Sequence, residues 1–204
     1  MDCLTQTIAG KVTCMNISTS RITLRDFKSA DRAAFVSYQM DPRYRRLYDL
    51  DEDSDRAHDL FELFASWRDE KPRSNFQLGL FDTATHRLRG CAGLRLRPED
   101  PETAVLGIEL SPNDWGRYRV ALDAAACLVE HGFNTLHLRM IVGNTASGNK
   151  RVEKLAHWFG ARIIDRRDGP EWMRSRGWHE VDWALTRDEW QHSEQLRGTK
   201  NDRF

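Results

Sequence analysis

The residues best suited to chemistry lie in a basic turn that follows a short apolar strand. The strand is expected over 105–110, and the turn that follows contains Gly116, Arg117 and Arg119 before an amphipathic helix. A helix start leaves backbone N–H groups unbonded, and these groups attract anions together with the helix dipole. The two arginines add positive charge at the same place. The turn is therefore a candidate pyrophosphate site, which points to a nucleotide-like cofactor.

The elements around this turn follow from the spacing of apolar residues. Strands are expected over 21–25, 76–81, 88–96, 105–110, 136–142, 161–164 and 178–185. Helices are expected after Ser29, around 60–67, from the basic turn to Gly132, and from Asn149 to Phe159, where Gly160 follows. This order predicts a mixed α/β fold, α+β-like, with one twisted, mostly antiparallel sheet of about seven strands and about four helices.

Length and composition predict one globular domain. The chain has 204 residues, of which 40% are hydrophobic, an ordinary share for a protein with a packed core. Residues 1–19 have little pattern and are expected to be a loose N-terminal extension. The folded domain is expected over 20–190, and 191–204 is expected to be a polar C-terminal tail.

Charge and cysteine usage exclude several classes of function. Lys+Arg and Asp+Glu both number 31, so the basic surplus of a general nucleic-acid binder is missing. No apolar run reaches the roughly 20 residues of a membrane helix, and no signal peptide is recognisable at the N-terminus. The four cysteines have no metal-ligand spacing and fit a reducing compartment. We expect a cytoplasmic protein, a monomer or homodimer, with no metal, nucleic-acid or membrane partner.

Four separated segments resemble motifs of the GNAT acetyltransferase superfamily, most closely its ribosomal-protein N-acetyltransferase branch. They are the first strand RITLR at 21–25, GCAG at 90–93, the run from Gly107 to Arg117 containing P-x-x-W-G-R, and 177–190, which ends in LTRDEW. No single segment is specific, but their order and spacing agree over about residues 21–190. The resemblance implies a GNAT-type fold and an acetyl-CoA-dependent enzyme.

The resemblance also assigns residues to the cofactor. It implies that Leu110, at the end of the fourth strand, and the backbone of the turn bind acetyl-CoA. The turn residues concerned are Gly116, Arg117, Tyr118, Arg119, Val120 and Ala121. An asparagine that opens the next helix contacts the pantetheine arm in the family. Asn149 fits better than Asn144, because its distance to the helix end at Gly160 matches; a helix N-cap is the competing interpretation of Asn149.

One position departs from the family pattern. The family turn is normally glycine-x-glycine, and Tyr118 occupies the second glycine position. Tyrosine lacks the freedom of glycine at positive φ. Either the turn follows a different path, with Arg117 and Arg119 compensating, or CoA binding is weakened.

Acetyl transfer to an amine would need a base, a site for the carbonyl oxygen and a proton donor for the thiolate. Glu109 is the first candidate base and Glu180 the second; a surface or salt-bridged glutamate is the competing interpretation of each. The family's tyrosine donor corresponds to Ala156 here, so Ser147 is a possible substitute, although a cap is the commoner role of such a serine.

These residues predict an N-acetyltransferase that moves an acetyl group directly to a primary amine of a small molecule or a protein N-terminus. Trp172 and Trp178 flank the polar loop 174–176, and such a loop often shapes the acceptor pocket in this architecture. That aromatic and basic rim suggests an acceptor with some negative or π character. The alternative is a non-catalytic module on the same fold that binds acyl-CoA or a partner.

Overall fold

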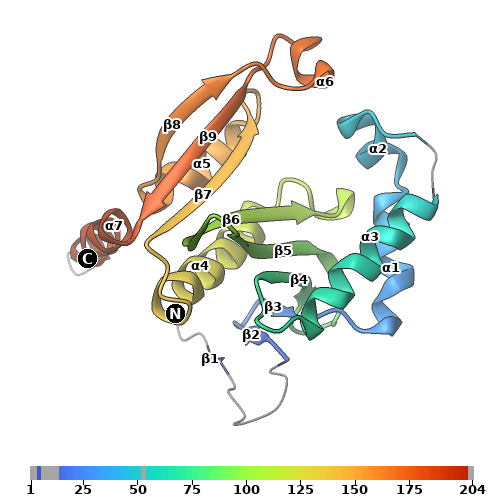
Figure 1. The fold of residues 1–204 in the computed structure, drawn as a ribbon, viewed down its shortest axis with the longest axis horizontal. Coiled ribbons are helices and arrows are strands. Elements are labelled where there is room, and N and C mark those ends of the chain that lie inside the picture. Colours follow the sequence, from blue (N-terminus) through green and yellow to red (C-terminus); the bar gives the residue numbers. More distant parts are fainter. Residues whose placement is uncertain (1–3, 6–13, 52–53, 202–204) are drawn as a thin grey trace. The chain divides into compact units, whose positions relative to one another are not determined.

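A computed structural model describes residues 4–5, 14–51 and 54–201 (Figure 1). The chain divides into two compact units. The first unit contains residues 1–95 and 107–128, and the second contains residues 96–106 and 129–204. Strand β6 (Asp100–Leu110) and helix α4 (Tyr118–Asn134) contribute residues to both.

The sheet of the first unit is built from antiparallel neighbours in sequence order. Strands β1 to β5 pair successively, and β6 follows β5 in the strand order. The bounds are Leu4–Thr5 for β1, Asn16–Ser18 for β2, Ile22–Arg25 for β3, Asn75–Asp82 for β4 and Leu88–Arg97 for β5. The β4–β5 hairpin is closed by Asp82, whose Oδ1 accepts from the backbone N–H of Ala84 and Thr85.

Three helices of the first unit build an aromatic core with this sheet. They are α1 (Arg32–Gln39), α2 (Pro42–Tyr48) and α3 (Ser54–Ser66). The core contains Phe27, Phe35, Tyr38, Tyr44, Phe61, Phe81, Leu88 and Cys91. Burial of such large rings is the main stabilising contribution to the unit.

In the second unit, a short parallel pairing leads into an antiparallel sheet. The strand order is β6, β7 (Met140–Ala146), β9 (Glu180–Thr186) and β8 (Arg162–Arg167). The β6–β7 register covers Thr103 to Val105 against Met140 to Val142, whereas β7 pairs with β9 along its whole length. The helices are α5 (Lys150–Phe159), α6 (Glu171–Arg174) and α7 (Arg187–Asn201).

Local sequence signals set the ends of two helices in this unit. Helix α5 has Asn149 as N-cap, and Gly160 ends it at a φ of 86°. Helix α7 begins with a capping box: the N–H of Glu189 donates to Thr186 Oγ1, and Glu189 Oε2 accepts from the N–H of Thr186.

The fold class predicted from the sequence is confirmed, and the structure corrects several details. The described residues form nine strands, with helices α2, α6 and α7 in addition to those expected. Residues 16–18 form β2, although they were assigned to the loose extension; residues 1–3 and 6–13 lie outside the described part. Helix α7 likewise occupies most of the expected polar tail, because the capping box starts a helix there.

Two element bounds inside the domain also differ from the expected ones. Gly132 does not end α4, which continues to Asn134, and β7 starts four residues later than expected.

No helix in the described part of the chain has the length and apolar character needed to cross a bilayer.

Candidate active site

Glu109 is the centre of a hydrogen-bonded cluster in the first unit. Its Oε1 accepts from Tyr38 Oη at 2.8 Å and from Gln39 Nε2 at 2.7 Å. Its Oε2 accepts from Tyr44 Oη at 2.6 Å. Three donors therefore hold both oxygens of one carboxylate, which fixes its orientation.

The donors come from the two sides of a helix break. Tyr38 and Gln39 lie in the last turn of α1, and Tyr44 lies in the first turn of α2. Asp41 caps α2 by accepting from the N–H of Arg43, and Pro42 occupies the first helical position. The Asp41-Pro42 pair therefore ends one helix and also starts the next, which brings Tyr44 to the same carboxylate as Tyr38.

Burial makes this glutamate a plausible base. Tyr38, Gln39 and Tyr44 are at most 7% exposed, whereas Glu109 itself remains partly exposed. Burial raises the pKa of Glu109 above its usual value, and the hydrogen bonds from Tyr44, Tyr38 and Gln39 offset part of that rise. A carboxyl group with a raised pKa takes a proton more readily at neutral pH, as a general base must.

The groups around Glu109 stay protonated. Burial raises the pKa of both Tyr38 and Tyr44, so their hydroxyls act as donors. Cys91 Sγ lies 3.9 Å from Glu109 Oε1, and burial raises the pKa of this thiol as well. A buried thiol of this kind is not a nucleophile, and Glu109 is the group of this cluster suited to accept a proton.

The basic turn follows a different path from the glycine-x-glycine pattern. Gly116 takes the left-handed conformation, with a φ of 88°. Tyr118 is the first residue of α4 and is not among the described residues with positive φ. The missing second glycine therefore causes no backbone strain, since one glycine supplies the whole change of direction.

The turn exposes its charged side chains beside the start of α4. The N–H groups of Arg117, Tyr118 and Val120 there donate to the carbonyls of Asp114, Gly116 and Arg117. Arg117 and Arg119 are exposed, as is Gly116 between Trp115 and Arg117. Trp115 Nε1 donates to the carbonyl of Leu110 at 2.9 Å, which ties the turn to the end of β6. Val120 is buried and Ala121 half-buried, and the cofactor contacts predicted for the backbone of this turn stay a prediction. An exposed α4 start with two arginines fits a pyrophosphate.

Ser147 and Asn149 both have local structural roles in the second unit. Asn149 Oδ1 accepts from the N–H of Val152 at 3.3 Å, so the residue is the N-cap of α5. Ser147 exchanges two hydrogen bonds with His179: its N–H donates to the His179 carbonyl, and its Oγ accepts from the His179 N–H. Asn149 is exposed, and its side chain lies at the surface of the α5 start.

Glu180 is committed to an ion pair. Its Oε2 lies 2.9 Å from Arg167 Nη2, and its Oε1 accepts from Asn144 Nδ2. This geometry agrees with the salt-bridged interpretation and makes Glu109 the better base of the two.

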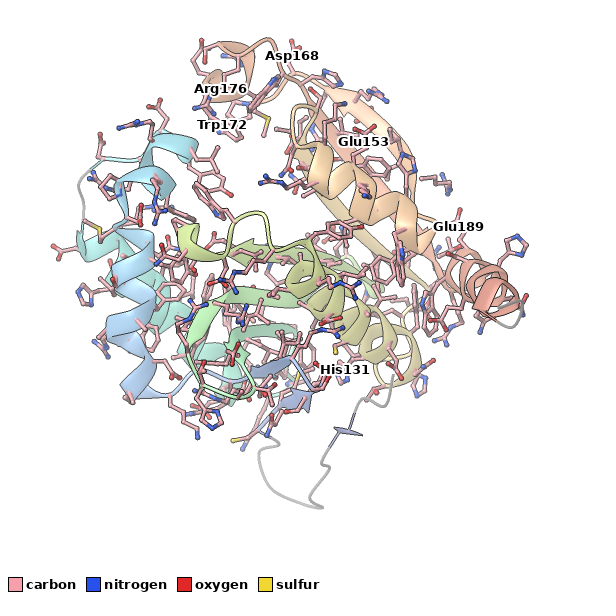
Figure 2. All side chains as sticks on the ribbon, turned by 180° about the vertical axis from the view of Figure 1, so that it is seen from behind. His131, Glu153, Asp168, Trp172, Arg176 and Glu189 are labelled. Carbon is pink, nitrogen blue, oxygen red and sulfur yellow. The ribbon has the colours of Figure 1, made fainter. Side chains whose placement is uncertain are left out.

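The loop between β8 and β9 carries an aromatic and basic cluster. Arg176 Cζ lies 5.5 Å from the ring centroids of both Trp172 and Trp178, at cation–π distance. Figure 2 shows Trp172 and Arg176 together on this loop. Trp178 also covers Gly148, where a Cβ atom would lie 2.2 Å from the indole. The loop is thereby held against the segment 147–149 that opens α5.

The predicted site residues are divided between the two units. Glu109, Leu110 and the turn 116–121 belong to the first unit, and Ser147, Asn149 and Glu180 belong to the second. Sequence reasoning missed Gln39 and Tyr44, and it placed Tyr38 only on an apolar stripe. The Asp41-Pro42 pair was the available signal for a second helix. Within the described residues, no three His, Cys, Asp or Glu side chains gather as metal ligands.

The chain belongs to the GNAT acetyltransferase domain family, whose model matches residues 21–162. Comparison with curated proteins gives no match.

Solved structures with the same fold support this assignment. A GNAT-family acetyltransferase from Bacillus anthracis has a TM-score of 0.66 at 17% identity, covering 84% of this chain and 98% of that one. A candidate ribosomal-protein-serine acetyltransferase from Vibrio cholerae has a TM-score of 0.65 at 17% sequence identity, and the match covers 84% of this chain and 97% of that one. A chimera of the Vibrio cholerae spermidine N-acetyltransferase with hSSAT has a TM-score of 0.67 at 15% sequence identity, and the match covers 84% of this chain and 99% of that one. At such identities the likeness shows the fold.

Proposed function

We propose that this protein is an acetyl-CoA-dependent N-acetyltransferase that acts on a primary amine of a small molecule or a protein N-terminus. The family supports acetyl transfer. The observation that carries the more specific proposal is the Glu109 carboxylate, which has a raised pKa and accepts hydrogen bonds from three buried donors. An amine acceptor needs such a base, because the ammonium form is not a nucleophile.

The chemistry is a direct transfer. Bound acetyl-CoA supplies the thioester. Glu109 takes one proton from the acceptor ammonium, and the neutral nitrogen forms the new N–C bond. The C–S bond breaks, the nitrogen gives up its second proton, and the released CoA thiolate takes up one proton, so that the products are an amide and the CoA thiol. Backbone N–H groups of the strand that carries Glu109 are candidates to stabilise the carbonyl oxygen.

The candidate cofactor groups are those that the family resemblance implies. The first unit supplies the exposed α4 start with Arg117 and Arg119, which suit the pyrophosphate. The second unit supplies Asn149 as the candidate contact for the pantetheine arm. Ser147 is the candidate proton donor to the thiolate: its oxygen accepts from His179, and its own O–H proton is still available to donate.

Substitution of the proposed base tests the function. We expect wild-type protein to bind acetyl-CoA in calorimetry and to acetylate members of a panel of primary amines. Glu109→Gln should bind acetyl-CoA as the wild type does but lose about 10²–10⁴-fold in kcat, the usual contribution of a positioned base.

Glu180→Gln is the matched control, because it removes a strand glutamate that is already ion-paired. Its kcat should stay within a few-fold of the wild type. Equal losses in the two variants would contradict the assignment of Glu109. Binding of acetyl-CoA without turnover of any amine would instead favour the non-catalytic acyl-CoA-binding module.

A further inference from the structure

Asp114 is a buried carboxylate directly before the basic turn. Its side chain has no exposed surface, yet it lies in a short 3₁₀ turn (Pro112–Asp114) between β6 and α4. Its Oδ2 accepts from Arg87 Nη1 at 2.7 Å and from Ser111 Oγ at 3.0 Å. Its Oδ1 accepts from Arg87 Nη2 at 2.9 Å and from Arg89 Nη1 at 3.1 Å.

The same residue also holds the first arginine of the turn. Arg117 Nε lies 3.4 Å from Asp114 Oδ1, and the Arg117 N–H donates to the Asp114 carbonyl at 3.1 Å. Asp114 thus contacts Ser111 before the turn, Arg87 directly before β5, Arg89 within β5, and the turn itself. Buried charged groups with this many partners hold a single geometry, since any other arrangement leaves the charge unpaired.

The cluster carries a positive surplus toward solvent. Arg89 is only 12% exposed and is also paired with Asp82. The side chains of Arg87 and Arg117 are 45% and 56% exposed. Three guanidinium groups therefore face two carboxylates, and the exposed part of the cluster consists of Arg87 and Arg117 beside the helix start.

We propose that Asp114 is a positioning residue that fixes the cofactor turn and holds Arg87 and Arg117 beside it as cations for the pyrophosphate of acetyl-CoA. The inference rests on the proposed function. It explains how the turn keeps one shape with a single glycine: the conformation is fixed by the buried carboxylate rather than by a second glycine. It also adds Arg87, which the sequence offered no reason to place at the turn.

The test is acetyl-CoA affinity in Asp114→Asn. We expect the dissociation constant, measured by calorimetry, to rise about tenfold or more, the scale of a lost charge-assisted contact. At saturating acetyl-CoA, kcat for an acetylated amine should stay within about threefold, because Glu109 is untouched.

Asp123→Asn is the matched control. Asp123 is also buried, at 1% exposure, and is also bound by one arginine through two hydrogen bonds, Arg21 at 2.6 and 2.7 Å. It lies in the second turn of α4, and its side chain is bonded to Arg21. This substitution should lower thermal stability as Asp114→Asn does, and leave the acetyl-CoA dissociation constant within about twofold of the wild type.

Arg87→Gln keeps the proposal testable if Asp114→Asn does not fold. This variant removes a half-exposed cation and should raise the dissociation constant several-fold. Equal affinity of wild type, Asp114→Asn and Arg87→Gln would overturn the positioning role while leaving the acetyltransferase proposal intact. Equal weakening in Asp114→Asn and Asp123→Asn would also overturn it. A wild type that does not bind acetyl-CoA at all would remove both proposals.

Discussion

At the scale of single residues, Glu109 is distinguished by the burial of the three side chains that donate to it. Its three donors, Tyr38, Gln39 and Tyr44, are at most 7% exposed, and Glu109 as a whole residue is half-buried. Burial and hydrogen bonding act on its pKa in opposite directions, and burial is the larger effect. The donors therefore tune the base as well as orient it.

Removal of one donor should change the pH dependence of catalysis. Tyr44 Oη lowers the pKa of Glu109, so Tyr44→Phe should raise that pKa further. The acid limb of kcat/KM against pH should then move to higher pH by about one unit. At pH values well above the limb, the rate should recover.

A comparison with Tyr38→Phe sharpens this prediction. Tyr38 lowers the Glu109 pKa less than Tyr44 does, so the limb should move in the same direction by a smaller amount. An unchanged limb in both variants would mean that Glu109 is not the group that titrates.

At the scale of elements, the position of Glu109 depends on how closely β5 approaches β6. Gly90 has a φ of 150°, and a Cβ atom there would lie 2.0 Å from the Glu109 carbonyl oxygen and 2.8 Å from Leu110 Cα. Both are backbone atoms, which cannot move aside as a flexible side chain can. Only glycine lets the two strands meet at this point.

Gly90→Ala should therefore displace the strand that carries the base. We expect a loss of roughly 2–4 kcal/mol in the free energy of unfolding, measured with urea, and a lower kcat. Gly107→Ala is the matched control on β6, where the nearest atom to the new Cβ would be the end of the Arg95 side chain at 3.4 Å. Its stability should change by less than about 1 kcal/mol. Equal effects in the two variants would contradict this reading of the strand contact.

At the scale of the whole molecule, the net charge is balanced, but the carboxyl groups fall into two classes whose contributions to stability change with pH in opposite directions. Within the described part of the chain, eight carboxyl groups have a pKa below their usual value because of arginine, lysine, hydroxyl or backbone partners. They are Asp31, Asp41, Asp69, Asp82, Asp100, Asp114, Glu153 and Glu189. Each contributes stability above its unfolded pKa of about 4, and this stability is lost as the pH falls through the folded value. Glu109 has a raised pKa, so its contribution to stability instead increases as the pH falls.

Two variants should distinguish these opposite pH dependences of stability. Asp114→Asn should lose about 2 kcal/mol relative to the wild type at pH 7, and the difference should shrink as the pH falls below about 4. For Glu109→Gln, the stability of the wild type relative to the variant should instead increase as the pH falls, because the protonated Glu109 is the favoured form. Urea unfolding from pH 7 to pH 3 measures both. A pH-independent difference for Asp114→Asn would contradict its role as a stabilising anion.

The sequence by itself determined the parts of this protein that depend on local pattern. The alternating strands 21–25 and 76–81, the α5 helix between Asn149 and Gly160, and the glycine-containing turn before α4 all follow from residues near one another in the chain. Those signals, with the order of the motifs, were enough for the fold class and the family. The α7 capping box was equally local, and the expectation of a polar tail overlooked it.

Only the tertiary structure decided which side chains meet. Tyr38, Gln39 and Tyr44 lie 65–71 residues from Glu109 in the chain, and Arg87 lies 27 residues from Asp114. No periodicity encodes such pairs, because they depend on the packing of α1 and α2 and on the register of β5. The backbone conformation at Tyr118 also became clear only from the tertiary structure. Tyr118 is helical, so the departure from the glycine-x-glycine pattern at this position requires no glycine.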